Sequence, residues 1–159
     1  MSASPSLAGA LRAEISGFEE LCRVLDEERA ALVEADADRL LTLSEEKTRV
    51  VERLRDLAHA RTRVMHGLSL DPHAPDFACR SVGSSGSDTK VLATLWNALL
   101  DVAGKARDRN HGNGELLAVR MTHNRVALET LSAAARRHSV YGPDGQSIIQ
   151  PSNRTLGQA

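Results

Sequence analysis

Histidine, cysteine and carboxylate side chains are the residues of this sequence that could hold a metal ion or catalyse a reaction. His59, His66 and His73 follow one another at intervals of seven residues. Helical metal sites use closer, paired ligand spacings such as HExxH, and neither that motif nor paired Cys/His spacing accompanies these histidines. We therefore expect scattered histidines that face solvent, with no metal site and no cofactor.

The other reactive residues also favour structural roles. Cys22 and Cys79 lie in different segments and form no CxxC motif, which predicts reduced thiols, with Cys22 packed as a small apolar side chain. The acidic run 26–28 is typical of a solvated helix face. There is no P-loop, Rossmann fingerprint or GxSxG motif, and the glycines of 112–114 do not follow a predicted strand. The sequence therefore predicts a protein that is not an enzyme.

Composition predicts an all-α protein with one helical domain. The chain has 159 residues, 3% aromatic residues and five prolines, and the prolines leave two long stretches, 6–71 and 76–142, free of proline. Both stretches are rich in Ala, Leu, Glu and Arg, which favour helices, whereas β-sheet cores depend on aromatic and β-branched residues. We expect an elongated antiparallel bundle of three long helices, over about 7–35, 36–68 and 88–138, within a domain spanning 1–140.

Bulk charge and hydropathy exclude several classes of function. The formal net charge of −1 argues against a protein built to bind nucleic acid, which would carry an excess of Lys and Arg. No stretch approaches 18 consecutive apolar residues, so no membrane insertion is expected. The N-terminal residues lack the basic region of a signal peptide, which favours a cytoplasmic location.

Apolar residues follow the spacing of a coiled-coil seam in the first two predicted helices. In the second helix, four further apolar residues beside the seam are predicted to widen the apolar stripe. Asp36 or Asp38 is expected to cap that helix, and the short connection predicts an antiparallel hairpin. The first seam comprises Leu11, Ile15, Phe18, Cys22, Leu25 and Leu32, with Arg29 in the missing position; the second comprises Leu40, Leu43, Lys47, Val50, Leu54, Leu57, Arg61, Val64 and Leu68, widened by Leu41, Val51, Ala58 and Met65.

The third predicted helix follows a Pro-, Gly- and Ser-containing loop at 69–87, with Ser87 or Asp88 as its cap. Asn-Gly at 113–114 alone would suggest a turn that divides the helix in two. The 3-4 spacing of Ala106, Asn110, Asn113 and Leu117 nevertheless runs through that pair and favours a continuous helix. Residues 141–159 have no helical periodicity and are expected to form a flexible tail.

Charge is distributed unevenly along the chain. Residues 10–39 carry an excess of acidic side chains, whereas residues 104–137 carry an excess of basic ones. Segments of opposite charge attract each other when they pack side by side. We expect this asymmetry to favour bundle assembly, with the steering of a ligand as the alternative.

The pattern as a whole resembles the FlgN-type flagellar export chaperones. In the first half, the resemblance rests on the leucine-rich hairpin 21–57 with its acidic turn. The second half is more specific, because Asn-x-x-Asn-Gly inside a helix followed by Tyr-Gly-x-x-Gly-Gln is unusual. Its matching residues are Trp96, Ala106, Arg107, Asn110, Asn113, Gly114, Leu117, Asn124, Leu128, Leu131 and 141–146. The loop 69–87 and the residues after Gln146 depart from the pattern.

The resemblance implies a cytosolic chaperone of the type III flagellar export system that uses no nucleotide or metal. Such chaperones bind the C-terminal helices of hook–filament junction (hook-associated) proteins. They prevent these proteins from associating prematurely and deliver them to the export gate. By this resemblance, Tyr141 in the tail is the expected docking point for the gate. The alternatives are a structural coiled-coil protein or a helical adaptor that acts by self-association. A third possibility is a helical adaptor of another secretion system, which would differ only in its client.

The third predicted helix is longer than the first two, and the client site is expected in the part that extends beyond them. Part of its apolar stripe is then left to accept an amphipathic helix. The competing interpretation is that the same residues form core or the seam of a homodimer. The expected client-binding residues are Leu117, Met121, Asn124, Leu128 and Leu131.

Overall fold

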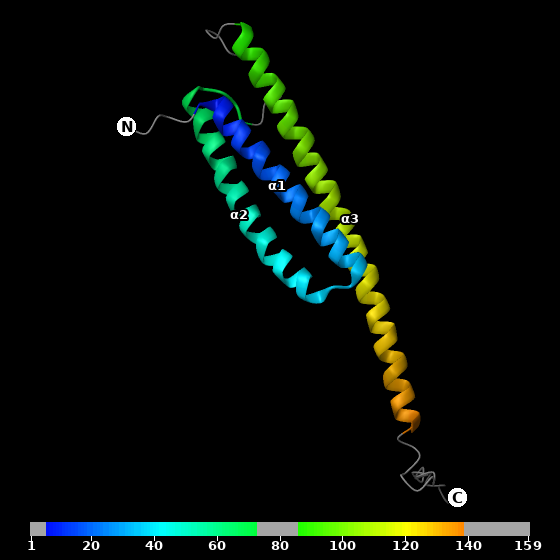
Figure 1. Ribbon diagram of the computed structural model, residues 1–159. Helices are drawn as coiled ribbons and strands as arrows, with labels where there is room; N and C mark the ends of the chain where they lie inside the picture. The colour runs from blue at the N-terminus through cyan, green and yellow to red at the C-terminus, as the bar shows by residue number, and fades with distance from the viewer. Residues whose placement is uncertain (1–5, 73–85, 139–159) are drawn as a thin grey trace, which may run out of the picture. The chain divides into compact units, whose positions relative to one another are not determined.

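Three long helices make up most of the described part of the chain, which comprises residues 6–72 and 86–138 of a computed structural model (Figure 1). They are α1 (Leu7–Glu34), α2 (Ala37–Gly67) and α3 (Gly86–His138), and the described residues contain no strand. The predicted all-α class is therefore confirmed. The helix ends differ from the predicted ones by one or two residues.

Two predicted segments lie largely or wholly outside the described residues. Most of the predicted loop at 69–87 falls there, as does the predicted tail at 141–159 with Tyr141. The chain also divides into two units, Met1–Leu116 and Leu117–Ala159, which are described separately below.

Local side-chain chemistry accounts for the turn between α1 and α2. Ala35 adopts a left-handed conformation with φ of 60°, which ends α1. Asp36 then caps α2, because its carboxylate accepts a hydrogen bond of 3.0 Å from the backbone N–H of Arg39. Asp38, the other predicted cap, lies in the first turn of α2, where its charge complements the helix dipole.

In the first unit, α1 and α2 form the predicted antiparallel hairpin (Figure 1). Gly17 lets the two helices approach closely, since a Cβ atom at this position would lie 2.8 Å from Cδ2 of Leu54. The buried core between the helices comprises Val24, Ala31, Leu43, Val50 and Leu54.

The apolar stripe of α2 is narrower than predicted. Leu41 and Val51 are exposed and do not widen it, whereas Met65 is fully buried. Only one side of α2 faces other helices in this unit, so residues at the edges of the stripe remain in water. Leu68, the last residue of the predicted stripe, is also exposed and follows the end of α2.

In the first unit, α3 runs parallel to α1 and antiparallel to α2. Near the start of α1, Leu7 and Leu11 pack with Leu99 of α3 and Met65 of α2. Farther along, Ala106 packs with Cys22 and Leu25 of α1. The buried Cys22 thus behaves as the predicted small apolar side chain.

The helix α3 continues through Asn-Gly at 113–114, as the 3-4 spacing predicted. Asn113 is buried, but Asn110, which that spacing placed on the same side, is exposed. The helix also begins earlier than expected. Ser87 and Asp88, the predicted caps, lie inside its first turn because α3 starts at Gly86.

Candidate functional site

A buried ion pair joins the three helices of the first unit. Nε of Arg61 in α2 lies 2.6 Å from Oε2 of Glu14 in α1, and both side chains are largely buried. The guanidinium of Arg61 also lies over the ring of Trp96 in α3, 5.2 Å from its centroid. This polar junction lies beside the apolar cluster of Leu11, Met65 and Leu99.

A second polar group crosses the bundle at its other end. Asn113 of α3 donates its amide N–H groups to the carbonyl of Leu25, at 2.8 Å, and to the carboxylate of Glu28, at 2.9 Å. Glu28 in turn forms an ion pair of 2.9 Å with Lys47 of α2. The Asn113 side chain is almost fully buried, yet its Oδ1 atom has no hydrogen-bond partner among the described residues. These contacts connect all three helices of the first unit through a series of polar side chains, Asn113, Glu28 and Lys47.

The arginine one turn before Asn113 makes a third link between α1 and α3. Nε of Arg109 lies 2.8 Å from Oδ1 of Asp26, and its Nη1 lies 3.3 Å from Sγ of Cys22. The hydrogen bond to the Asp26 carboxylate raises the pKa of Arg109 above its ordinary value. This link pairs an acidic residue of α1 with a basic residue of α3, as the charge distribution predicted.

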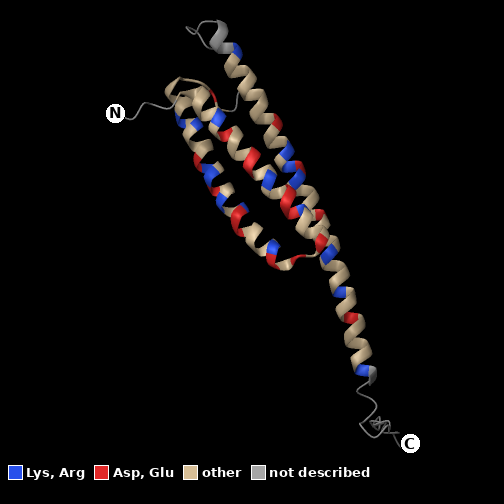
Figure 2. Ribbon diagram, viewed as in Figure 1, with Lys and Arg blue, Asp and Glu red and all other residues tan. Residues whose placement is uncertain are grey.

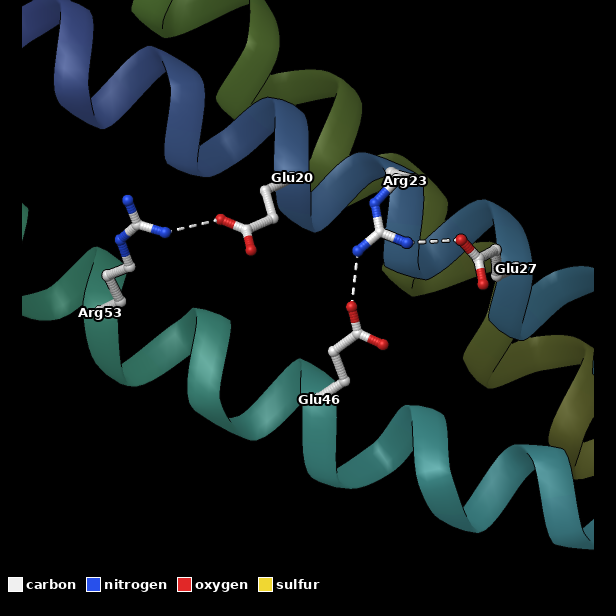
Figure 3. A network of polar contacts seen from close by, with 5 residues as sticks. All are labelled: Glu20, Arg23, Glu27, Glu46 and Arg53. Atoms are coloured by element: carbon white, nitrogen blue, oxygen red, sulfur yellow. Dashed lines mark hydrogen bonds and ion pairs between the residues drawn. The ribbon is translucent and has the colours of Figure 1, made fainter.

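The acidic residues of α1 also pair with α2. Figure 3 shows Glu20 of α1 beside Arg53 of α2. It also shows Arg23 of α1 between Glu27 of its own helix and Glu46 of α2, a pair of the opposite polarity. These pairs are exposed, and each such pair contributes little to stability. The acidic character of α1 thus serves both of its neighbouring helices, rather than α3 alone.

Arg29 takes the vacant position in the seam of α1. It is exposed, and its Nη1 atom lies 3.4 Å from the point where a Cβ atom of Gly112 would stand. The absence of a side chain at Gly112 therefore leaves room for the guanidinium against α3.

In the second unit, α3 exposes the apolar residues that were predicted to bind a client. Leu117, Met121, Leu128 and Leu131 have between 45% and 66% of their surface in contact with solvent. Asn124, which lies among them, is also exposed. We call these five residues the exposed seam. Their spacing of 4, 3, 4 and 3 places them along one side of the helix.

A shallow pocket lies along this same part of α3. Three residues of the exposed seam, Met121, Asn124 and Leu128, line it together with Arg125, Glu129, Ser132, Ala135 and Arg136. The one acidic residue of this lining, Glu129, is paired with Arg125 at 3.8 Å, so the arginines outnumber it. Leu117 and Leu131 are not among its lining residues. Apolar side chains flanked by arginines suit an amphipathic, acidic helix better than a small polar ligand.

The opposite side of the same helical segment carries a sparser set of apolar residues. Val119 and Val126 are half exposed and lie seven residues apart. They stand roughly half a turn away from Leu117 and Leu128 around the helix. The leucine side therefore offers more apolar surface than the valine side.

The part of the chain that the structure describes holds neither a metal-ligand cluster nor a membrane-spanning helix. Among residues 6–72 and 86–138, no three His, Cys, Asp or Glu side chains gather as metal ligands. None of the helices described there is long and apolar enough to cross a bilayer.

Sequence reasoning missed the polar junction of Glu14, Arg61 and Trp96. A signal was present, because Arg61 and Lys47 both occupy positions of the otherwise apolar stripe of α2. A charged residue at such a position requires a partner when it is buried. Glu14 and Glu28 are the partners that the structure supplies.

Comparison with known protein families gives one match that covers most of the chain. A family model described as FlgN protein matches residues 1–147. The matched range includes all three helices, the exposed seam and Tyr141. The comparisons with curated proteins and with solved structures give no match.

Proposed function

Because the chain belongs to the FlgN family of flagellar export chaperones, we propose that it binds the C-terminal helices of hook–filament junction proteins. In this proposal it acts in the cytoplasm, prevents these proteins from associating early and delivers them to the flagellar export gate. The chaperone role follows from the family, whereas the particular clients, the gate and the cellular location are the proposal.

The observation that carries this proposal is the exposed seam of the second unit. A soluble helix seldom leaves an ordered row of large apolar residues in water unless the row binds something. Its 4-3 spacing is the one by which helices pack together, so an amphipathic client helix is a fitting occupant. A second copy of the chain is the competing occupant.

The mass of the protein in solution, with and without a client, distinguishes these occupants. We expect addition of a purified hook–filament junction protein to produce a defined soluble complex, measured by size-exclusion chromatography with light scattering. Removal of the client's C-terminal helix should prevent formation of the complex. A stable homo-oligomer that ignores the client would contradict the proposal and favour a structural coiled-coil protein.

We assign docking at the export gate to Tyr141, which lies outside the described residues. The assignment rests on the resemblance of 141–146 to the family's tail motif. We expect Tyr141→Ala to retain client binding but lose binding to the purified cytoplasmic part of the gate, measured by surface plasmon resonance. Tyr141→Phe is the matched control for the aromatic ring. Unchanged gate binding by Tyr141→Ala would remove the assignment.

A further inference from the structure

The contact between α1 and α3 shows how one side of α3 recognises a helix. At its centre, Ala106 packs against Cys22 and Leu25, and Asn113 donates to the Leu25 carbonyl and the Glu28 carboxylate. Both partners of Asn113 are hydrogen-bond acceptors, so its amide nitrogen must face them. A buried asparagine with such partners fixes the register of two helices.

A pattern of one apolar residue followed by an asparagine seven positions later occurs twice along α3. Eleven residues after Ala106 and Asn113 come Leu117 and Asn124, and a further eleven residues after Leu117 comes Leu128. Eleven residues correspond to slightly more than three complete turns of an α-helix, so each repeat returns to the same side within about 20°. Asn124 thus occupies the register position in the exposed seam that Asn113 occupies in the first unit.

Charge indicates the kind of helix that fits the exposed seam. In residues 117–138, the arginines outnumber the acidic residues, of which Glu129 is the single example (Figure 2). The helix that covers the earlier repeat, α1, supplies acidic residues at its edge, namely Asp26 to Arg109 and Glu28 to Asn113. The arginines of 117–138 are Arg120, Arg125, Arg136 and Arg137.

We propose that the exposed seam selects an amphipathic client helix with acidic edges, and that Asn124 sets the register of that helix by donating to one of its carboxylates. This inference rests on the proposed function and adds a rule of recognition to it. The client helix presents to the second unit the same chemistry that α1 presents to the first. Leucines supply the apolar contact, whereas Asn124 and the two arginines beside it in the pocket, Arg125 and Arg136, select the partner.

Substitution of Asn124 by leucine separates this rule from simple apolar packing. Asn124→Leu makes the seam more apolar, so packing alone predicts equal or tighter binding. If Asn124 donates to a client carboxylate, loss of that charge-assisted hydrogen bond weakens binding, by about tenfold. The measurement is fluorescence anisotropy of a labelled peptide that contains the C-terminal helix of a hook–filament junction protein. Thr130→Leu, on the other side of the same helix, is the matched control and should leave the affinity unchanged.

Peptide variants identify the carboxylate concerned. Each acidic residue of the peptide is replaced in turn by its amide, and one replacement should weaken binding to the wild-type chain but not to Asn124→Leu. Equal or tighter binding by Asn124→Leu, or a bound helix with basic edges, would overturn this inference and leave the proposed function standing. Failure of the wild-type chain to bind any junction-protein helix would overturn the proposed function itself.

Discussion

Replacing both Leu128 and Leu131 with aspartate is expected to abolish client binding while the protein keeps its helical content. Both leucines are about two-thirds exposed, so the folded chain loses little when they change. In a complex, each buried leucine contributes about 1.5–3 kcal/mol, and two lost leucines correspond to a decrease in affinity of at least about 100-fold. The introduced carboxylates would further oppose an acidic client helix.

The matched control places the same charges on the opposite side of the helix. Val119→Asp with Val126→Asp changes the net charge equally and removes two β-branched residues of similar exposure. We expect this pair of changes to leave client binding within a few-fold of the wild type, with the affinities of both variants measured by fluorescence anisotropy of the labelled client peptide. Loss of helical circular dichroism in the leucine variant would show that Leu128 and Leu131 are core residues and that the proposed site is wrong.

Loss of the buried ion pair in the first unit is expected to have the largest effect on stability. Arg61→Ala leaves the carboxylate of Glu14 buried, 4% exposed, without its guanidinium partner. An uncompensated buried charge of this kind costs about 3–5 kcal/mol, a large fraction of the stability of a typical small domain. The variant also loses the contact between the guanidinium and the ring of Trp96. Urea unfolding followed by circular dichroism measures the loss.

Two further variants make this prediction specific. Arg53 lies in α2, like Arg61, and forms an exposed ion pair with Glu20 of α1. Arg53→Ala breaks that pair and should lower the free energy of unfolding by no more than about 1 kcal/mol. Replacing Glu14 and Arg61 together with leucine should recover most of the stability, because no unpaired charge then remains. A loss of similar size in Arg61→Ala and Arg53→Ala would mean that the buried pair is not important for folding.

Spacing of apolar residues predicts the elements of this fold well, because the helices are long and each keeps one regular 3-4 spacing along its apolar side. The hairpin, the cap at Asp36 and the passage of α3 through Asn-Gly all follow from local rules. The width of each apolar stripe does not, since it depends on how many helices cover it. Leu41 and Val51 belong to the apolar pattern, yet both are exposed.

The polar partners inside the bundle are harder to predict for a related reason. Arg61 and Lys47 interrupt the stripe of α2 visibly, but α1 offers many carboxylates as partners. Which of these becomes buried depends on the relative rotation of two helices, and periodicity alone does not determine that rotation. The exposed seam is more predictable, because its residues lie on one helix and its 4-3 spacing is local.

Trp96 is the single tryptophan of the chain and lies under the guanidinium of Arg61 in the first unit. Its fluorescence therefore has one source, whose surroundings change when the three helices separate. The exposed seam belongs to the second unit and contains no aromatic residue. Tryptophan emission consequently reports on unfolding of the polar junction of Glu14, Arg61 and Trp96. A fluorescent label on the client reports on client binding to the exposed seam. The chain thus carries an intrinsic optical reporter that separates a variant that has lost its fold from one that has lost its client.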